Sequence, residues 1–106
     1  MYMTKKVILA NKTPLSDEIW KYSHPDDVFA KGKKADILIY RSFKPDKKYM
    51  VLTPDDKWVH FGQMGWEDYT KHKDDERRDR FLKRSSEWRG LDNIYSPAFL
   101  SRYFLW

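Results

Sequence analysis

The chain has 106 residues, of which 41% are hydrophobic, 17% are aromatic and 35% are charged. This length predicts a single domain over residues 1–106, and the aromatic content excludes a wholly disordered chain. The absence of cysteine excludes disulfides, thiolate chemistry and cysteine-based zinc sites, while the formal net charge of +5 suits an acidic partner.

The first 35 residues predict an arm, a short helix and a loop. Residues 1–13 form a possible extended arm with a short strand at 7–9, which we expect to dock on a sheet edge or on a neighbouring subunit. Thr13 is expected to be the N-cap of a helix that His24 and Pro25 end. An exposed basic loop is expected at residues 31–34.

Apolar runs in the sequence are short. The longest run near the start covers residues 7–10, whereas a signal peptide needs about 7–15 apolar residues and a membrane span about 20. The sequence therefore predicts a soluble protein that is made in the cytoplasm and has no membrane partner.

The middle of the chain predicts three strands. Residues 37–43 are apolar on both faces, and residues 49–53 and 58–61 are rich in residues that favour strands. Turn-forming residues at 44–47 and 54–57 make both connections tight. This pattern predicts an antiparallel meander.

Two helices are expected to cover that meander. The first is densely charged and runs over residues 75–88, with Asp74 as N-cap and Gly90 as the stop. The second, over residues 98–106, is apolar almost all round. The sequence therefore predicts an α+β fold, a small antiparallel meander of about three strands packed by a charged helix and a C-terminal aromatic helix.

The connection from the third strand to the charged helix is expected to form a structural clasp. On a helical wheel Arg78 falls inside the inward face and Arg77 on its edge, and an inward arginine needs a paired anion. Glu67 and Asp68 are the candidate partners. The predicted clasp consists of Gly62, Gly65, Asp68, Tyr69, His72, Asp74, Arg77 and Arg78.

Two alternatives would give this region and the sheet a binding role. Cations of the charged helix could contact phosphates, although the interspersed acids disfavour it; these cations are Arg77, Arg80, Lys83 and Arg84. Aromatic residues of the strands could stack on bases. These are Tyr40, Tyr49, Trp58 and Phe61.

Histidines raise the possibility of a metal or catalytic site. His60 and His72 lie near Asp68 and Asp74, but their spacing matches no recurrent ligand motif. No nucleophile or anion-holding loop accompanies them, and residues 62–65 do not form a P-loop. We therefore predict a non-enzymatic protein with no cofactor, no metal and no small-molecule substrate.

Several motifs in the second half of the chain resemble a known family. They are VHFG at 59–62, Gly65, DYT at 68–70, HKD at 72–74 with Arg77, Phe-Leu-x-Arg at 81–84, and SPAFLSRYFLW at 96–106. This pattern is similar to that of a small uncharacterised protein family of large DNA viruses and tailed phages, and the resemblance covers about residues 36–106. It implies a viral context, without activity or binding residues to carry over.

Small, cysteine-free, aromatic-rich proteins of viruses are often virion components. By this analogy we expect a viral structural protein in the virion, an auxiliary or minor capsid component that bridges larger subunits. Its partner would be the major capsid protein, bound through the N-terminal arm and through Phe99, Tyr103 and Trp106.

The alternative is a small basic nucleic-acid-binding protein of viral origin, whose affinity would fall steeply with salt. Its expected phosphate contacts are Lys31, Lys33, Lys34, Lys47, Lys48 and Arg77.

Overall fold

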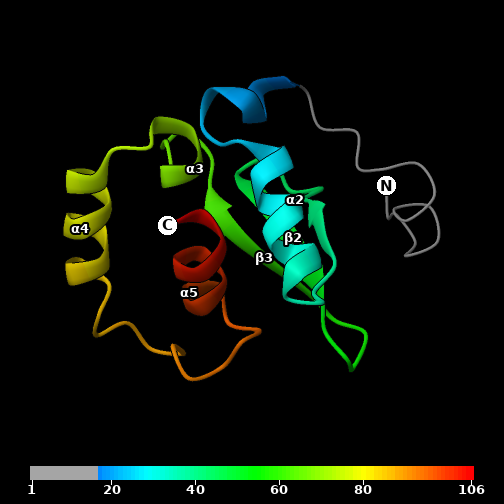
Figure 1. Ribbon diagram of the computed structural model, residues 1–106. Coiled ribbons are helices and arrows are strands. Elements are labelled where there is room, and N and C mark those ends of the chain that lie inside the picture. Colours follow the sequence, from blue (N-terminus) through cyan, green and yellow to red (C-terminus); the bar gives the residue numbers. More distant parts are fainter. Residues whose placement is uncertain (1–16) are drawn as a thin grey trace.

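Three antiparallel strands form one sheet in a computed structural model that describes residues 17–106 (Figure 1). The strands are β1 (Ile39–Arg41), β2 (Lys47–Leu52) and β3 (Trp58–Gln63), in the order β1-β2-β3. The two short connections make the sheet a meander, so the predicted α+β fold is confirmed.

Six helical elements surround this sheet in the described part of the chain. They are η1 (Asp17–Lys21), α2 (Pro25–Lys34), α3 (Tyr69–His72), α4 (Asp75–Arg84), α5 (Pro97–Leu100) and η2 (Ser101–Leu105). Figure 1 shows α2 lying across the sheet, α5 beside β3, and α4 standing further out with the C-terminus between it and β3. Within residues 17–106, no helix is long and apolar enough to cross a membrane.

One hydrophobic core joins the sheet to the helices. Alternate side chains of a strand point to the same face of the sheet, so Tyr49, Val51 and Phe61 lie on one face. This face packs against the helices. The buried core residues are Ile19, Val28, Ile39, Tyr49, Val51, Phe61, Leu100, Phe104 and Leu105.

The predicted basic loop at 31–34 is wrong, because these residues form the last turn of α2. His24 and Pro25 begin this helix where we expected them to end one. The His24 side chain accepts a hydrogen bond from the Asp27 backbone N–H at 3.4 Å, and proline suits the first helical position because it has no N–H to satisfy. The expected arm at 1–13, its strand at 7–9 and the Thr13 cap lie outside the described residues.

The helices of the second half begin where the sequence predicts and end differently. Asp74 caps α4 by accepting from the backbone N–H groups of Glu76 and Arg77 at 3.0 and 3.2 Å, as predicted. However, α4 ends at Arg84, where Ser85 turns its hydroxyl back to the Phe81 carbonyl at 2.7 Å. The C-terminal segment is one α-helical turn, α5, followed by the π-helical turn η2.

Candidate nucleic-acid interface

A cleft of about 520 Å³ opens between α4, the end of β3 and the C-terminal segment. It is lined by Lys47, Lys48, Gly62, Gln63, Trp66, Glu67, Asp68, Arg77, Arg80, Phe81, Arg84, Trp88, Ser101, Leu105 and Trp106. Gly62 lines the cleft at a position that requires glycine. Its φ is +80°, and a Cβ at this position would lie only 2.8 Å from Leu105 Cδ1. Three residues of the predicted clasp line the cleft, which are Gly62, Asp68 and Arg77, and the whole lining holds five cationic side chains and two carboxylates.

A buried ion pair lies at the inner end of the cleft. Lys48 Nζ is 3.1 Å from Asp68 Oδ2, and the two side chains are 3% and 1% exposed. The same ammonium donates to the backbone carbonyls of Trp66 at 2.6 Å and Tyr22 at 3.2 Å. Burial lowers the pKa of Lys48, because it disfavours the charged ammonium. The three N–H donors of this ammonium meet three acceptors, which offsets the cost of burying the charge. The alternative prediction of Lys48 as a phosphate contact is wrong, because all three of its N–H donors are already used.

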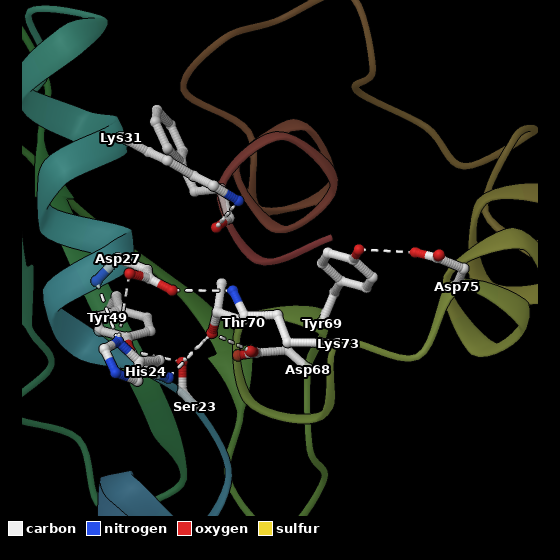
Figure 2. A network of polar contacts seen from close by, with 11 residues as sticks. Ser23, His24, Asp27, Lys31, Tyr49, Asp68, Tyr69, Thr70, Lys73 and Asp75 are labelled. Carbon is white, nitrogen blue, oxygen red and sulfur yellow. Dashed lines mark hydrogen bonds and ion pairs between the residues drawn. The ribbon is translucent and has the colours of Figure 1, made fainter.

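Asp68 extends the ion pair into a chain of hydroxyl groups (Figure 2). The Thr70 hydroxyl donates to Asp68 Oδ1, and Ser23 Oγ lies 3.1 Å from Thr70 Oγ1 and 2.6 Å from the Tyr49 hydroxyl. Burial raises the pKa of Tyr49, so its hydroxyl stays protonated and able to donate. This network joins β2 to α3 and to the segment before α2, and it makes Asp68 a structural residue.

Arginines at the start of α4 contact different partners from those predicted. Arg78 is exposed, donates from Nε to the Trp106 carbonyl at 2.8 Å and lies over the Tyr69 ring at 5.1 Å. Arg77 is the half-buried one, with Nη1 at 3.4 Å from Glu67 Oε1. The predicted pairing of Arg78 with Glu67 or Asp68 is therefore wrong. The helical wheel gives only the direction of a side chain from the helix axis, and in that direction Arg78 meets the Trp106 carbonyl and the Tyr69 ring in place of a carboxylate.

Three of the five cationic side chains in the cleft are not paired with carboxylates. Arg80 and Arg84 lie four residues apart on α4, both are exposed, and no carboxylate within residues 17–106 forms an ion pair with either. Lys47, at the start of β2, is likewise without an acidic partner in this part of the chain. These three side chains leave the cleft with a positive charge that its own carboxylates do not neutralise.

Aromatic rings form a row along the cleft. Trp106 stacks on Phe81 with ring centroids 4.2 Å apart, and Phe81 meets Trp88 edge-to-face at 5.4 Å. His72 packs on Trp106 with ring centroids 5.1 Å apart, and its Nδ1 accepts from the Asp74 backbone N–H at 2.9 Å. The predicted partner-binding residue Trp106 therefore packs within its own chain.

The other predicted site residues lie outside the cleft. Lys31 donates to the Phe104 carbonyl at 3.3 Å, and Lys33 and Lys34 are exposed at the end of α2. Phe99 and Tyr103 stack on each other at 5.5 Å. They line a shallow groove of about 240 Å³ together with Leu82, Leu91 and Arg102.

His60 and His72 do not converge on a common site with acidic side chains. His60 Nδ1 lies 2.7 Å from Ser42 Oγ on the sheet, whereas His72 packs on Trp106, and neither lines the cleft. Within the described residues, no group of three or more histidine, aspartate and glutamate side chains could hold a metal ion. Of the strand aromatics, Tyr49 and Phe61 are buried and not available for stacking on bases.

Comparison with known proteins gives one match. A protein-family model described as a family of unknown function (DUF5754) matches residues 37–85. The matched segment runs from β1 to the end of α4, so it contains the Lys48–Asp68 pair and the unpaired Arg80 and Arg84. No curated protein and no solved structure matches the chain.

Proposed function

We propose that this is a non-enzymatic nucleic-acid-binding protein whose cleft contacts phosphates through Arg80, Arg84 and Lys47. The observation that supports the proposal is the difference among the cations of the cleft. Arg77 and Lys48 are neutralised by Glu67 and Asp68, whereas Arg80 and Arg84 have no acidic partner in the described part of the chain. Cationic side chains that form no ion pair within the fold are available to bind a ligand.

Spacing on α4 supports the same proposal. Residues four apart lie on one face of a helix with Cβ atoms roughly 5–6 Å apart, so Arg80 and Arg84 present two guanidinium groups side by side. A guanidinium has a planar fork of donors that matches the oxygens of a phosphate. The proposed contacts keep Lys47 from the expected set and replace Lys48 with these two arginines.

Binding of a fluorescent 20-nucleotide oligomer, followed by anisotropy, tests the proposal. Arg80→Ala combined with Arg84→Ala is expected to weaken binding at least tenfold and to reduce the slope of log K against log salt by about 1.4 for a single strand. The matched control is Lys33→Ala combined with Lys34→Ala, which removes the same charge from exposed positions outside the cleft. An equal loss in both double variants would contradict a role of the cleft, and no binding at low salt would contradict the function.

We also propose a second role, as an auxiliary component of a viral capsid. The resemblance to a viral family motivates it, and an exposed apolar feature supports it. Tyr103 is 57% exposed and stacks on Phe99 beside the groove that Leu82 and Leu91 line. The protein should then be present in purified particles at a fixed, high copy number, measured by quantitative mass spectrometry. Abundance in infected cells with absence from particles would contradict this role.

A further inference from the structure

We propose that the cleft selects single-stranded nucleic acid, by stacking unpaired bases on Trp66 and Trp88 while Arg80, Arg84 and Lys47 hold the adjoining phosphates. This inference rests on the proposed function and adds the kind of nucleic acid. It begins from the exposure of two large aromatic side chains within a positively charged cleft.

Trp66 is 71% exposed, the highest exposure of any aromatic residue in the described part of the chain. No ring within residues 17–106 packs on it, although five other aromatic rings form a continuous row, those of Tyr69, His72, Trp106, Phe81 and Trp88. Exposing an indole to water is unfavourable, and its large flat face suits a second aromatic ring. The Trp66 ring is therefore free to stack on a ligand.

The backbone that carries Trp66 is fixed, although its ring is free. The Trp66 carbonyl accepts from the buried Lys48 ammonium at 2.6 Å, and the Asp68 backbone N–H donates to the Tyr22 carbonyl at 3.0 Å. Gly65, with φ +95°, makes the turn that precedes it. A ring presented from a rigid backbone loses little entropy on binding, so the Lys48–Asp68 pair supports the ligand site without touching the ligand.

Trp88 supplies a second stacking surface, four residues after the end of α4. It is 44% exposed, and its ring is held edge-to-face against Phe81 at 5.4 Å with an interplanar angle of 86°. Arg80 and Arg84 line the same cleft from α4. The cleft thus combines aromatic faces with guanidinium groups, which is the pattern that single-strand-binding sites use.

Stacking on tryptophan requires an unpaired base. In a duplex the base faces are covered by neighbouring base pairs, whereas a single strand can splay its bases out onto aromatic side chains. The exposed side of α4 also disfavours insertion of this helix into a duplex groove. Asp75, Glu76 and Asp79 are exposed on α4 and would face the phosphates that flank a groove.

Selectivity for single strands is tested with four ligands, which are a dT 20-mer, a U 20-mer, a 20-base-pair duplex and inorganic polyphosphate. Binding of either single strand is expected to be at least tenfold tighter than binding of the duplex, with quenching of tryptophan fluorescence. Trp66→Ala and Trp88→Ala should each weaken single-strand binding about tenfold and leave polyphosphate binding unchanged. Trp66→Phe should restore most of the affinity, because phenylalanine also offers a flat face.

Trp20→Ala is the matched control, since Trp20 is 38% exposed and does not line the cleft. It should change no affinity, and circular dichroism of all variants checks that they fold. Equal affinity for duplex and single strands, still dependent on Arg80 and Arg84, would overturn this inference and leave the proposed function standing. No binding of any ligand at low salt would overturn both.

Discussion

At the scale of single residues, the clearest feature is a lysine that the fold buries. Lys48 is one of a run of lysines around a turn, and lysines in such runs are usually solvated. Here a carboxylate from 20 residues downstream and two backbone carbonyls surround its ammonium. The charge is tolerated because all of its donors are used, and the pair fixes the backbone next to Trp66.

We predict that Asp68→Ala lowers the free energy of unfolding by about 3–5 kcal/mol, because it leaves a buried ammonium without its counter-charge. Urea denaturation measures the effect. The control is Asp55→Ala, which breaks an ion pair of 3.6 Å with Lys57 between two exposed side chains and should change the free energy of unfolding far less. Equal midpoints and slopes for the two variants would show that the buried pair contributes no more than an exposed one.

At the scale of elements, α4 is held to the molecule by few contacts. None of its residues is buried, and ten residues are too few for an isolated helix to be stable in water. Its attachments include the Phe81–Trp106 stack, the hydrogen bond from Arg78 to the Trp106 carbonyl and the ion pair of Arg77 with Glu67. The Tyr69 hydroxyl also donates to Asp75, and Arg102 donates to the Leu82 carbonyl. The stack and the Arg78 hydrogen bond converge on Trp106, so this residue helps to position the wall that carries Arg80 and Arg84.

We predict that Trp106→Ala loosens α4 selectively. Amide hydrogen exchange should become at least tenfold faster within Asp75–Arg84 and change little in β2 (Lys47–Leu52), because the lost stacking acts on the helix and not on the sheet. Tyr103→Ala is the control, since Tyr103 is largely exposed and its ring packs on the rings of Phe99 and Phe104, which lie outside α4. A uniform rise in exchange over both elements would indicate global destabilisation instead.

At the scale of the whole molecule, stability should depend on pH through two histidines, His60 on β3 and His72 on α3. Burial, reinforced by Lys44 for His60 and by Arg77 for His72, lowers the pKa of both rings below 6.5. The folded protein therefore binds fewer protons than the unfolded chain just below that pH. Their contribution to stability is complete above about pH 6.5 and is lost as the pH falls through the folded pKa values.

We predict a smaller free energy of unfolding at pH 5.5 than at pH 7.5. Urea denaturation across this range measures the slope, and NMR titration of the ring protons should give midpoints below 6.5 for His60 and His72. His60→Gln combined with His72→Gln should flatten the dependence. Ring midpoints at or above 6.5 would contradict the expected direction.

Local features of this protein were determined by the sequence alone. Runs of strand-favouring residues and the turn residues between them predicted the three strands, and Asp74 predicted the start of α4. These features depend on hydrogen bonds and steric limits within a few neighbouring residues. The same reasoning was wrong at His24 and Pro25, because a proline that ends one helix equally well begins another.

Only the tertiary structure decided which charges and rings remain available. Lys48 is neutralised because Tyr22 and Asp68 approach it from 26 residues before and 20 residues after, and no local pattern records that approach. Arg77 finds Glu67 while Arg80 and Arg84 find no carboxylate in the described chain, although all three belong to one helix. Trp106 is covered by Phe81 while Trp66 stays exposed. Charge pairing and ring stacking need segments distant in sequence to meet, so the composition of the cleft emerges only when the chain folds.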